Sequence, residues 1–154
     1  MKIAVFLYVS EHIIKDHNVN LLLYHIVCPS KYRKKIFTTE VEETLKIVCI
    51  EISQRYEIRF VEIGSDEDHV HFLAQGVPVM SISRMVSIIK SITAREIYKS
   101  HPEVKQKLWG GNIWTSGYYV NTVGQYGNEK IISEYVKNQR KVYKQIYRDQ
   151  LSLF

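Results

Sequence analysis

The chain has 154 residues, of which 45% are hydrophobic and 24% charged, and its formal net charge is +5 at pH 7. This length suits one domain with a sizeable core, and the apolar content argues against an intrinsically disordered chain. Two basic blocks and 11 tyrosines suit a polyanion such as nucleic acid, although solvated basic faces are also common. The blocks contain Lys31, Arg33, Lys34 and Lys35 early in the chain, and Lys130, Lys137, Arg140, Lys141, Lys144 and Arg148 near its end.

Cysteine usage and the first residues bear on the compartment. Cys28 and Cys49 belong to no CxxC or similar metal pattern, so we interpret them as buried thiols of a reducing compartment. The start, MKIAVFLYVSEH, superficially resembles a signal peptide, but it lacks a small-residue cleavage site and soon reaches Glu11. We therefore expect residues 1–17 to form an N-terminal arm or extra strand. No run approaches the length of a membrane span, so we expect a cytoplasmic protein.

The first half of the chain predicts a strand, a helix and a second strand. Val19–Val27 is rich in strand-forming residues and is expected to end near Cys28. Thr39 and Glu42 then form a capping-box pattern, which starts a predicted helix from about Glu40 to Arg55. Apolar residues recur along it at helical spacing: Val41, Leu45, Val48 and Ile52. Ile58–Ile63 reads as the second strand.

The middle of the chain predicts a turn, a strand and another helix. We expect Gly64–Glu67 to form the turn and Asp68–Gln75 the strand. Ser81 opens an amphipathic helix that reaches roughly Lys99, where His101-Pro102 stops it.

The last third of the chain predicts one more strand and a long helix. The strand lies within Ile113–Val123, and a turn follows over Gly124–Gly127. Asn128 is a candidate N-cap for a helix from Glu129 to about Tyr147. The order β-α-β-β-α-β plus a C-terminal helix predicts an α+β fold with a ferredoxin-like or RRM-like antiparallel sheet.

The stretch DHVHFLAQ, from Asp68 to Gln75, places two histidines on one face of its strand. Successive side chains of a strand alternate between faces, so His69 and His71 lie together with their Cα atoms about 6.5 to 7 Å apart. They can converge on one cation, with a further ligand from elsewhere. Asp66 and Asp68 are suited to orient them from behind. The alternative is that both histidines are merely exposed polar residues on the open face of the sheet.

The predicted last helix adds a tyrosine and an amide at helical spacing. Tyr135 and Gln139 stand at positions i and i+4, one turn apart on the same face. Near the sheet, Gln139 could offer an oxygen to a metal ion beside the Tyr135 phenol, although the tyrosine could equally be packing. A tyrosine is a poor nucleophile at neutral pH, and a divalent cation that polarises a phosphodiester would help it. One coherent hypothesis is transesterification of a nucleic-acid backbone.

These residues give the chain a resemblance to a known family. From about Val19 to Tyr147 it resembles the single-tyrosine HUH transposases, the TnpA-type enzymes of small insertion sequences that move as single-stranded DNA. The matching pieces, in order, are YHIVCPSKYRKKIF from Tyr24, the D-x-D-H-hydrophobic-H run from Asp66, the segment LW followed by YYVNTVG, and Y-x-x-N-Q at Tyr135. The resemblance implies one HUH transposase domain over residues 1–154, with residues 128–154 as the helix that carries the tyrosine.

The resemblance also implies a site and a mechanism. His69, His71 and Gln139 would bind Mg²⁺ or Mn²⁺, and Tyr135 would attack a phosphodiester, join the 5′ phosphate and free a 3′ hydroxyl. The softer nitrogen ligands suggest that Mn²⁺ supports activity at least as well as Mg²⁺. Members recognise single-stranded DNA with hairpins and act as homodimers with a shared active site. Plausible DNA contacts are the basic residues Lys31, Arg33, Lys34, Lys35, Arg140 and Lys141.

Other functions fit parts of the same pattern. A non-catalytic single-stranded nucleic-acid-binding module has the same element order and could stack bases on Tyr118 and Tyr119. A domesticated HUH nuclease that processes palindromic repeats would keep the catalytic residues. A hydrolytic metalloenzyme built on His69 and His71 would need more ligands, and the remaining histidines show no useful spacing. We interpret these as surface or packed residues: His12, His17, His25 and His101.

Overall fold

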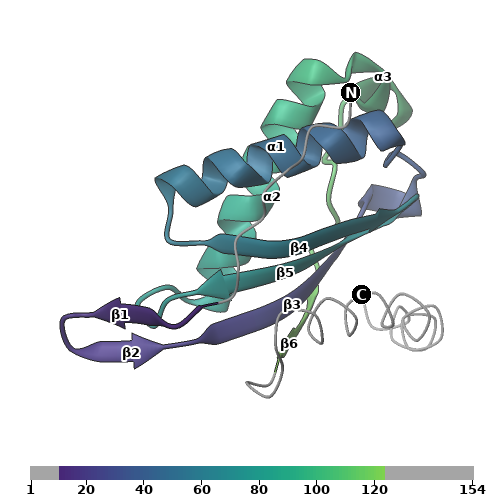
Figure 1. Cartoon of the computed structure of the whole chain (residues 1–154). Coiled ribbons are helices and arrows are strands. Elements are labelled where there is room, and N and C mark those ends of the chain that lie inside the picture. Colours follow the sequence, from purple (N-terminus) through teal and green to yellow (C-terminus); the bar gives the residue numbers. More distant parts are fainter. Residues whose placement is uncertain (1–10, 124–154) are drawn as a thin grey trace.

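A four-stranded antiparallel sheet with helices on one face organises the protein. The computed structural model describes residues 11–123, and its sheet has the strand order β4-β5-β3-β6. The helices α1 (Thr39–Arg55) and α2 (Ile82–Ser100) cover the same face (Figure 1). The strands are β3 (Leu22–Pro29), β4 (Arg59–Asp66), β5 (His69–Gly76) and β6 (Tyr119–Thr122). This arrangement confirms the predicted α+β fold; the expected C-terminal helix lies outside the described residues.

The main core lies between the sheet and the two helices. On β5, Val70, Phe72 and Ala74 point into it, because strand side chains alternate between faces. Facing them from α1 are Leu45 and Cys49, both fully buried. Burial raises the pKa of the Cys28 thiol on β3 to about 12, despite the nearby charge of Lys90. Both cysteines are therefore buried free thiols, as the sequence predicted.

The helix boundaries agree with the predicted ones, apart from a cap. The N-cap of α1 is Thr38, whose side chain accepts a hydrogen bond from the Val41 amide at 3.3 Å. The capping box expected from Thr39 and Glu42 is therefore wrong, because the Glu42 carboxylate instead accepts a hydrogen bond from Ser65 on β4. The N-cap of α2 is the predicted Ser81.

A short helix and a two-stranded hairpin add to the predicted elements, and the first strand of the hairpin lies within residues 1–17, where the sequence predicted an arm or extra strand. Pro102 occupies the first turn of a further short helix, α3 (Pro102–Lys107), after α2 ends. Near the start of the described chain, β1 (Ile13–Lys15) pairs with β2 (Asn18–Asn20) in a two-stranded hairpin. The single strand expected over Val19–Val27 is thus divided between β2 and β3. Among residues 11–123, no helix has the length and apolar character needed to cross a membrane.

A bulge in β4 determines which way its last residues point. The pairing of β4 with β5 shifts between Phe60 and Glu62, so that one extra residue, Val61, enters the strand. The turn expected over Gly64–Glu67 is wrong, because β4 continues to Asp66 and pairs Asp66 with His69. A one-residue shift moves all later side chains to the opposite face. Asp66 therefore shares the face of the histidines, away from the helices.

Candidate metal centre

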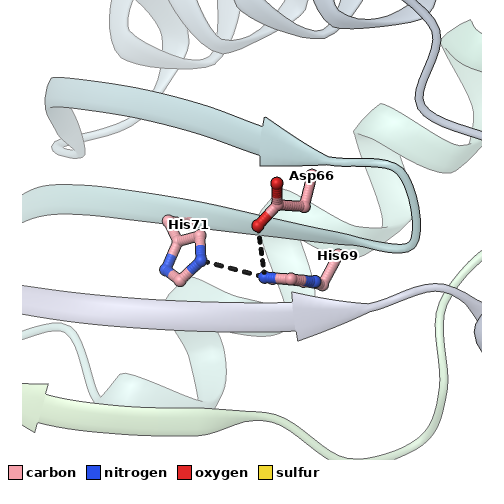
Figure 2. A group of neighbouring side chains, drawn as sticks. All are labelled: Asp66, His69 and His71. Carbon is pink, nitrogen blue, oxygen red and sulfur yellow. Dashed lines mark hydrogen bonds and ion pairs between the residues drawn. The ribbon is translucent and has the colours of Figure 1, made fainter. Parts of the chain in front are cut away.

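Three side chains converge at the end of the sheet where β4 ends and β5 begins. Asp66, His69 and His71 bring one ligand atom each to within 4.8 Å of one another (Figure 2). The Nε2 atoms of the two histidines lie 3.0 Å apart. The Asp66 Oδ2 atom lies 3.3 Å from the Nε2 atom of His69. Asp66, expected to orient the ligands from behind, is thus placed as a candidate ligand itself.

The histidines of this cluster are buried. His69 is 8% exposed and His71 is fully buried, so the alternative of merely exposed imidazoles on an open face is wrong. Buried polar groups are costly unless they have partners. Each ring has one: the Nδ1 atom of His69 lies 2.8 Å from the Asp68 carboxylate, and that of His71 lies 3.1 Å from His25.

Asp68 holds His69 from behind, as the sequence predicted. A carboxylate accepts hydrogen bonds, so the Nδ1 atom of His69 donates to it and its Nε2 lone pair faces the cluster. Arg33 binds the other Asp68 oxygen through Nε at 3.0 Å and Nη2 at 2.9 Å. Partial burial raises the pKa of Asp68, but the hydrogen bonds and charges of His69 and Arg33 outweigh it and lower the pKa overall.

His25 is packed, in agreement with the sequence, but the sequence did not indicate that it contacts His71. It lies on β3, fully buried, with its ring stacked on His71 at a centroid distance of 5.3 Å. Burial lowers its pKa to about 4, against a hydrogen bond with Asn121 that raises it. His25 is therefore neutral at physiological pH and can accept the Nδ1 proton of His71. One sequence feature could have indicated this contact: Leu23, His25 and Val27 are alternate residues of one strand and share a face. The sequence did not show that β3 lies beside β5.

The donor set fits a divalent cation. With the Nδ1 atoms occupied by Asp68 and His25, both His69 and His71 turn Nε2 lone pairs toward the Asp66 carboxylate. These three ligand atoms lie close enough together to hold one metal ion. Two imidazoles and a carboxylate suit Mn²⁺ and other first-row divalent ions, and a carboxylate also suits Mg²⁺.

Comparisons with known proteins identify the family of this chain. Residues 18–139 match the family model "Transposase IS200 like". The chain is 31% identical over 118 residues to the ISDra2 transposase TnpA of Deinococcus radiodurans, covering 77% of this chain and 84% of that one. The chain belongs to the IS200-like transposase family. It is thus a transposase, an enzyme that processes DNA in the transposition of an insertion sequence.

Two further relatives support the assignment. The transposase is 31% identical over 116 residues to the transposase of insertion sequence IS200 from Salmonella typhimurium, covering 75% of each chain. Its fold matches the crystal structure of a Deinococcus radiodurans R1 protein assigned as a transposase. That match has a TM-score of 0.67 and 31% identity, and it covers 82% of this chain and 96% of the other.

Four of the basic residues predicted to contact DNA lie in the loop after β3, and Arg33 among them contacts the metal centre through Asp68. Lys31 and Arg33 belong to the single-turn helix η1 (Lys31–Arg33), which follows β3. Arg33 is engaged by Asp68, and Lys35 forms an ion pair with Glu67 at 2.9 Å. The ammonium groups of Lys31 and Lys34 lie over aromatic rings. The other predicted residues of the transposase lie outside the described residues: Tyr135, Gln139, Arg140 and Lys141.

Proposed function

We propose that this transposase cleaves and rejoins single-stranded DNA through a 5′-phosphotyrosine intermediate on Tyr135, with Mg²⁺ or Mn²⁺ held at the histidine cluster. The observation that carries the proposal is the convergence of His69, His71 and Asp66 on one face of the sheet. The pairing of β4 with β5 holds these residues side by side. Family membership supports the same chemistry, since the chain has Tyr135 and Gln139 in the Y-x-x-N-Q motif.

The proposed site contains metal ligands and residues that orient these ligands. His69, His71 and Gln139 hold the cation, and Asp66 is placed to join them. Asp68 and His25 hold the two imidazoles in the tautomers that leave Nε2 free. A divalent cation bound there supplies Lewis-acid polarisation of the phosphodiester.

The proposed covalent step is a transesterification. The phenolic oxygen of Tyr135 loses its proton to solvent or a nearby base and forms a bond to phosphorus. The bond from phosphorus to the 3′ oxygen breaks, and that oxygen takes up a proton and leaves as a 3′ hydroxyl. The reverse attack by a different 3′ hydroxyl then joins the strands, so the number of phosphodiester bonds is conserved.

A covalent adduct tests this proposal directly. Purified protein is incubated with a pool of single-stranded DNA that includes its flanking genomic sequence, with Mg²⁺ or Mn²⁺, and adducts that survive denaturant are mapped by mass spectrometry. We expect an adduct on Tyr135 that is lost with chelator and in Tyr135→Phe but kept in the matched control Tyr143→Phe. Metal-independent hairpin binding with no adduct would instead support a non-catalytic binding module; an adduct on another tyrosine would overturn the assignment of Tyr135.

We further propose that the enzyme is a homodimer whose active site combines the histidines of one protomer with Tyr135 of its partner. Mixing inactive His69→Ala protein with inactive Tyr135→Phe protein tests this arrangement. If the site is shared, each mixed dimer contains one intact site, and about a quarter of the wild-type sites return after subunit exchange. If each protomer uses its own tyrosine, no mixed dimer is active.

A further inference from the structure

Two aromatic side chains stand exposed on neighbouring loops beside the metal centre. Tyr32, in η1, is 70% exposed, and Trp109, just after α3, is 82% exposed. Both have left-handed backbone conformations, with φ of 58° and 51°. Among residues 11–123, the other non-glycine residue with positive φ is Arg33, next to Tyr32. Such conformations are costly and concentrate at functional sites.

Lysine side chains accompany both rings. The Lys31 ammonium lies 5.3 Å from the centroid of the Tyr32 ring, and the Lys34 ammonium lies 5.3 Å from that of Trp109. The contact of Lys34 with Trp109 also shows that the two loops adjoin. The rings and their lysines thus form one surface, here termed the aromatic platform: Lys31, Tyr32, Lys34 and Trp109.

The platform is tied to the metal centre by short contacts. Arg33 follows Tyr32 and binds Asp68, which in turn binds His69. The backbone of the same loop is fastened to the β4–β5 turn, since the Ser30 amide donates to the Asp68 carbonyl at 2.9 Å. In Figure 1 the loop lies at the end of the sheet where β5 begins. The loop that carries Tyr32 and the histidine cluster therefore adjoin the same β4–β5 turn.

The chemistry of the platform favours unpaired bases. Exposed aromatic faces stack on bases, and adjacent cations neutralise phosphates, which is how proteins bind single strands without reading sequence. In a duplex the base faces are already stacked on one another, so an exposed ring has no access to them. We propose that Tyr32 and Trp109 form a stacking platform for unpaired bases of the DNA strand beside the scissile phosphate. This rests on the proposed single-stranded DNA substrate.

Trp109 provides its own optical signal. The chain has two tryptophans, and the other, Trp114, is 5% exposed, stacks on Phe37 and donates to Thr93. The full-length protein is titrated in chelator, which prevents cleavage, with a 20-nucleotide oligo-dT strand and with a blunt duplex. We expect the single strand to quench the emission of Trp109 and the duplex to leave it nearly unchanged.

Asparagine variants test the aromatic rings without disturbing the local backbone. Asparagine tolerates a left-handed backbone, so Trp109→Asn and Tyr32→Asn remove the rings without adding strain. Each is expected to weaken binding of oligo-dT by about 5-fold to 100-fold, the usual effect of losing one stacked base. The matched control is Val79→Asn, at an 88% exposed apolar residue, and it is expected to bind like wild type. Lys31→Ala should weaken single strand and duplex alike, because it loses a phosphate contact.

The outcomes distinguish this proposal from the proposed function. Unchanged oligo-dT affinity in both asparagine variants, while wild type forms the Tyr135 adduct, would overturn the platform and leave the catalysis intact. Weakened affinity with no adduct in wild type would support the platform and overturn the catalysis. If Trp109→Asn instead changes the oligomeric state in the absence of DNA, the ring contacts a second copy of the chain, and the platform is overturned.

Discussion

The two faces of β5 carry alternate residues of one strand, and they differ in chemistry. Val70, Phe72 and Ala74 face the helices and are fully buried in the apolar core. His69 and His71 face the other way and are buried as well, but among hydrogen-bonding partners. Burying apolar area stabilises the fold, whereas burying imidazoles costs stability that their partners offset only in part. The core face therefore contributes to stability, and the histidine face carries the candidate metal ligands.

The largest expected effect on chemistry comes from removing a ligand. His71→Ala should lower the rate of adduct formation by about 10³-fold or more, because the divalent cation supplies several kcal/mol of transition-state stabilisation. Rates are measured per folded molecule, with the folded fraction taken from circular dichroism. A variant that loses activity only in proportion to its folded fraction would contradict the assignment.

Substitution of Phe72, the next residue along β5, should lower stability and leave metal binding largely unchanged. Phe72 packs against Phe60 and Trp114 in the core, with ring centroids 5.9 Å and 6.5 Å away. Phe72→Ala should lower the free energy of unfolding by about 3–5 kcal/mol through the lost packing and the cavity left behind. Denaturant unfolding measures this loss. Metal affinity of the remaining folded protein should stay within a few-fold of wild type; a large drop would show that the two faces are coupled.

His25 should make the stability of the metal-free protein depend on pH. Its pKa is lowered from 6.5 to about 4 by burial. Between these values the unfolded chain binds a proton that the folded protein excludes. The contribution of neutral His25 to the free energy of unfolding is therefore fully present above pH 6.5. It decreases as the pH falls toward 4, by about 3 kcal/mol at most. Urea unfolding in chelator at several pH values should show a shallower decline in His25→Gln. The exposed residue His17 provides the control, His17→Gln, which should decline like wild type.

The smallest expected effect comes from Asp68, which is proposed to orient His69 and not to bind the metal ion itself. Asp68→Asn keeps an acceptor for His69 but removes the charge, so Mn²⁺ affinity should fall by about 10-fold to 100-fold. Calorimetry or electron paramagnetic resonance of bound Mn²⁺ measures it. The neighbouring Glu67→Gln is the matched control, since Glu67 pairs with the exposed Lys35 and not with a histidine. Equal affinities in wild type and Asp68→Asn would remove Asp68 from the site.

Local patterns in the sequence were sufficient for the order of the four sheet strands, α1 and α2, but not for α3 or the β1–β2 hairpin. Ser81 caps α2 as predicted, and the strand that carries His69 and His71 was located within one residue of its observed start. The cap of α1 was misplaced by one residue, because Thr38 and Thr39 are chemically equivalent candidates and the Glu42 side chain has a tertiary partner in Ser65. Such a choice depends on contacts that are distant in sequence.

The pattern of residues along the chain was enough to predict the fold class, the shared strand face of His69 and His71, and the place of Asp68 next to them. These follow from the two-residue period of a strand and from adjacency along the chain. Three features became visible only in the folded chain. The strand β3 brings His25 against His71, Arg33 contacts Asp68, and the bulge at Val61 turns Asp66 toward the histidines. Strand order and register depend on the packing of the whole sheet, and a shift of one residue reverses which face a side chain occupies.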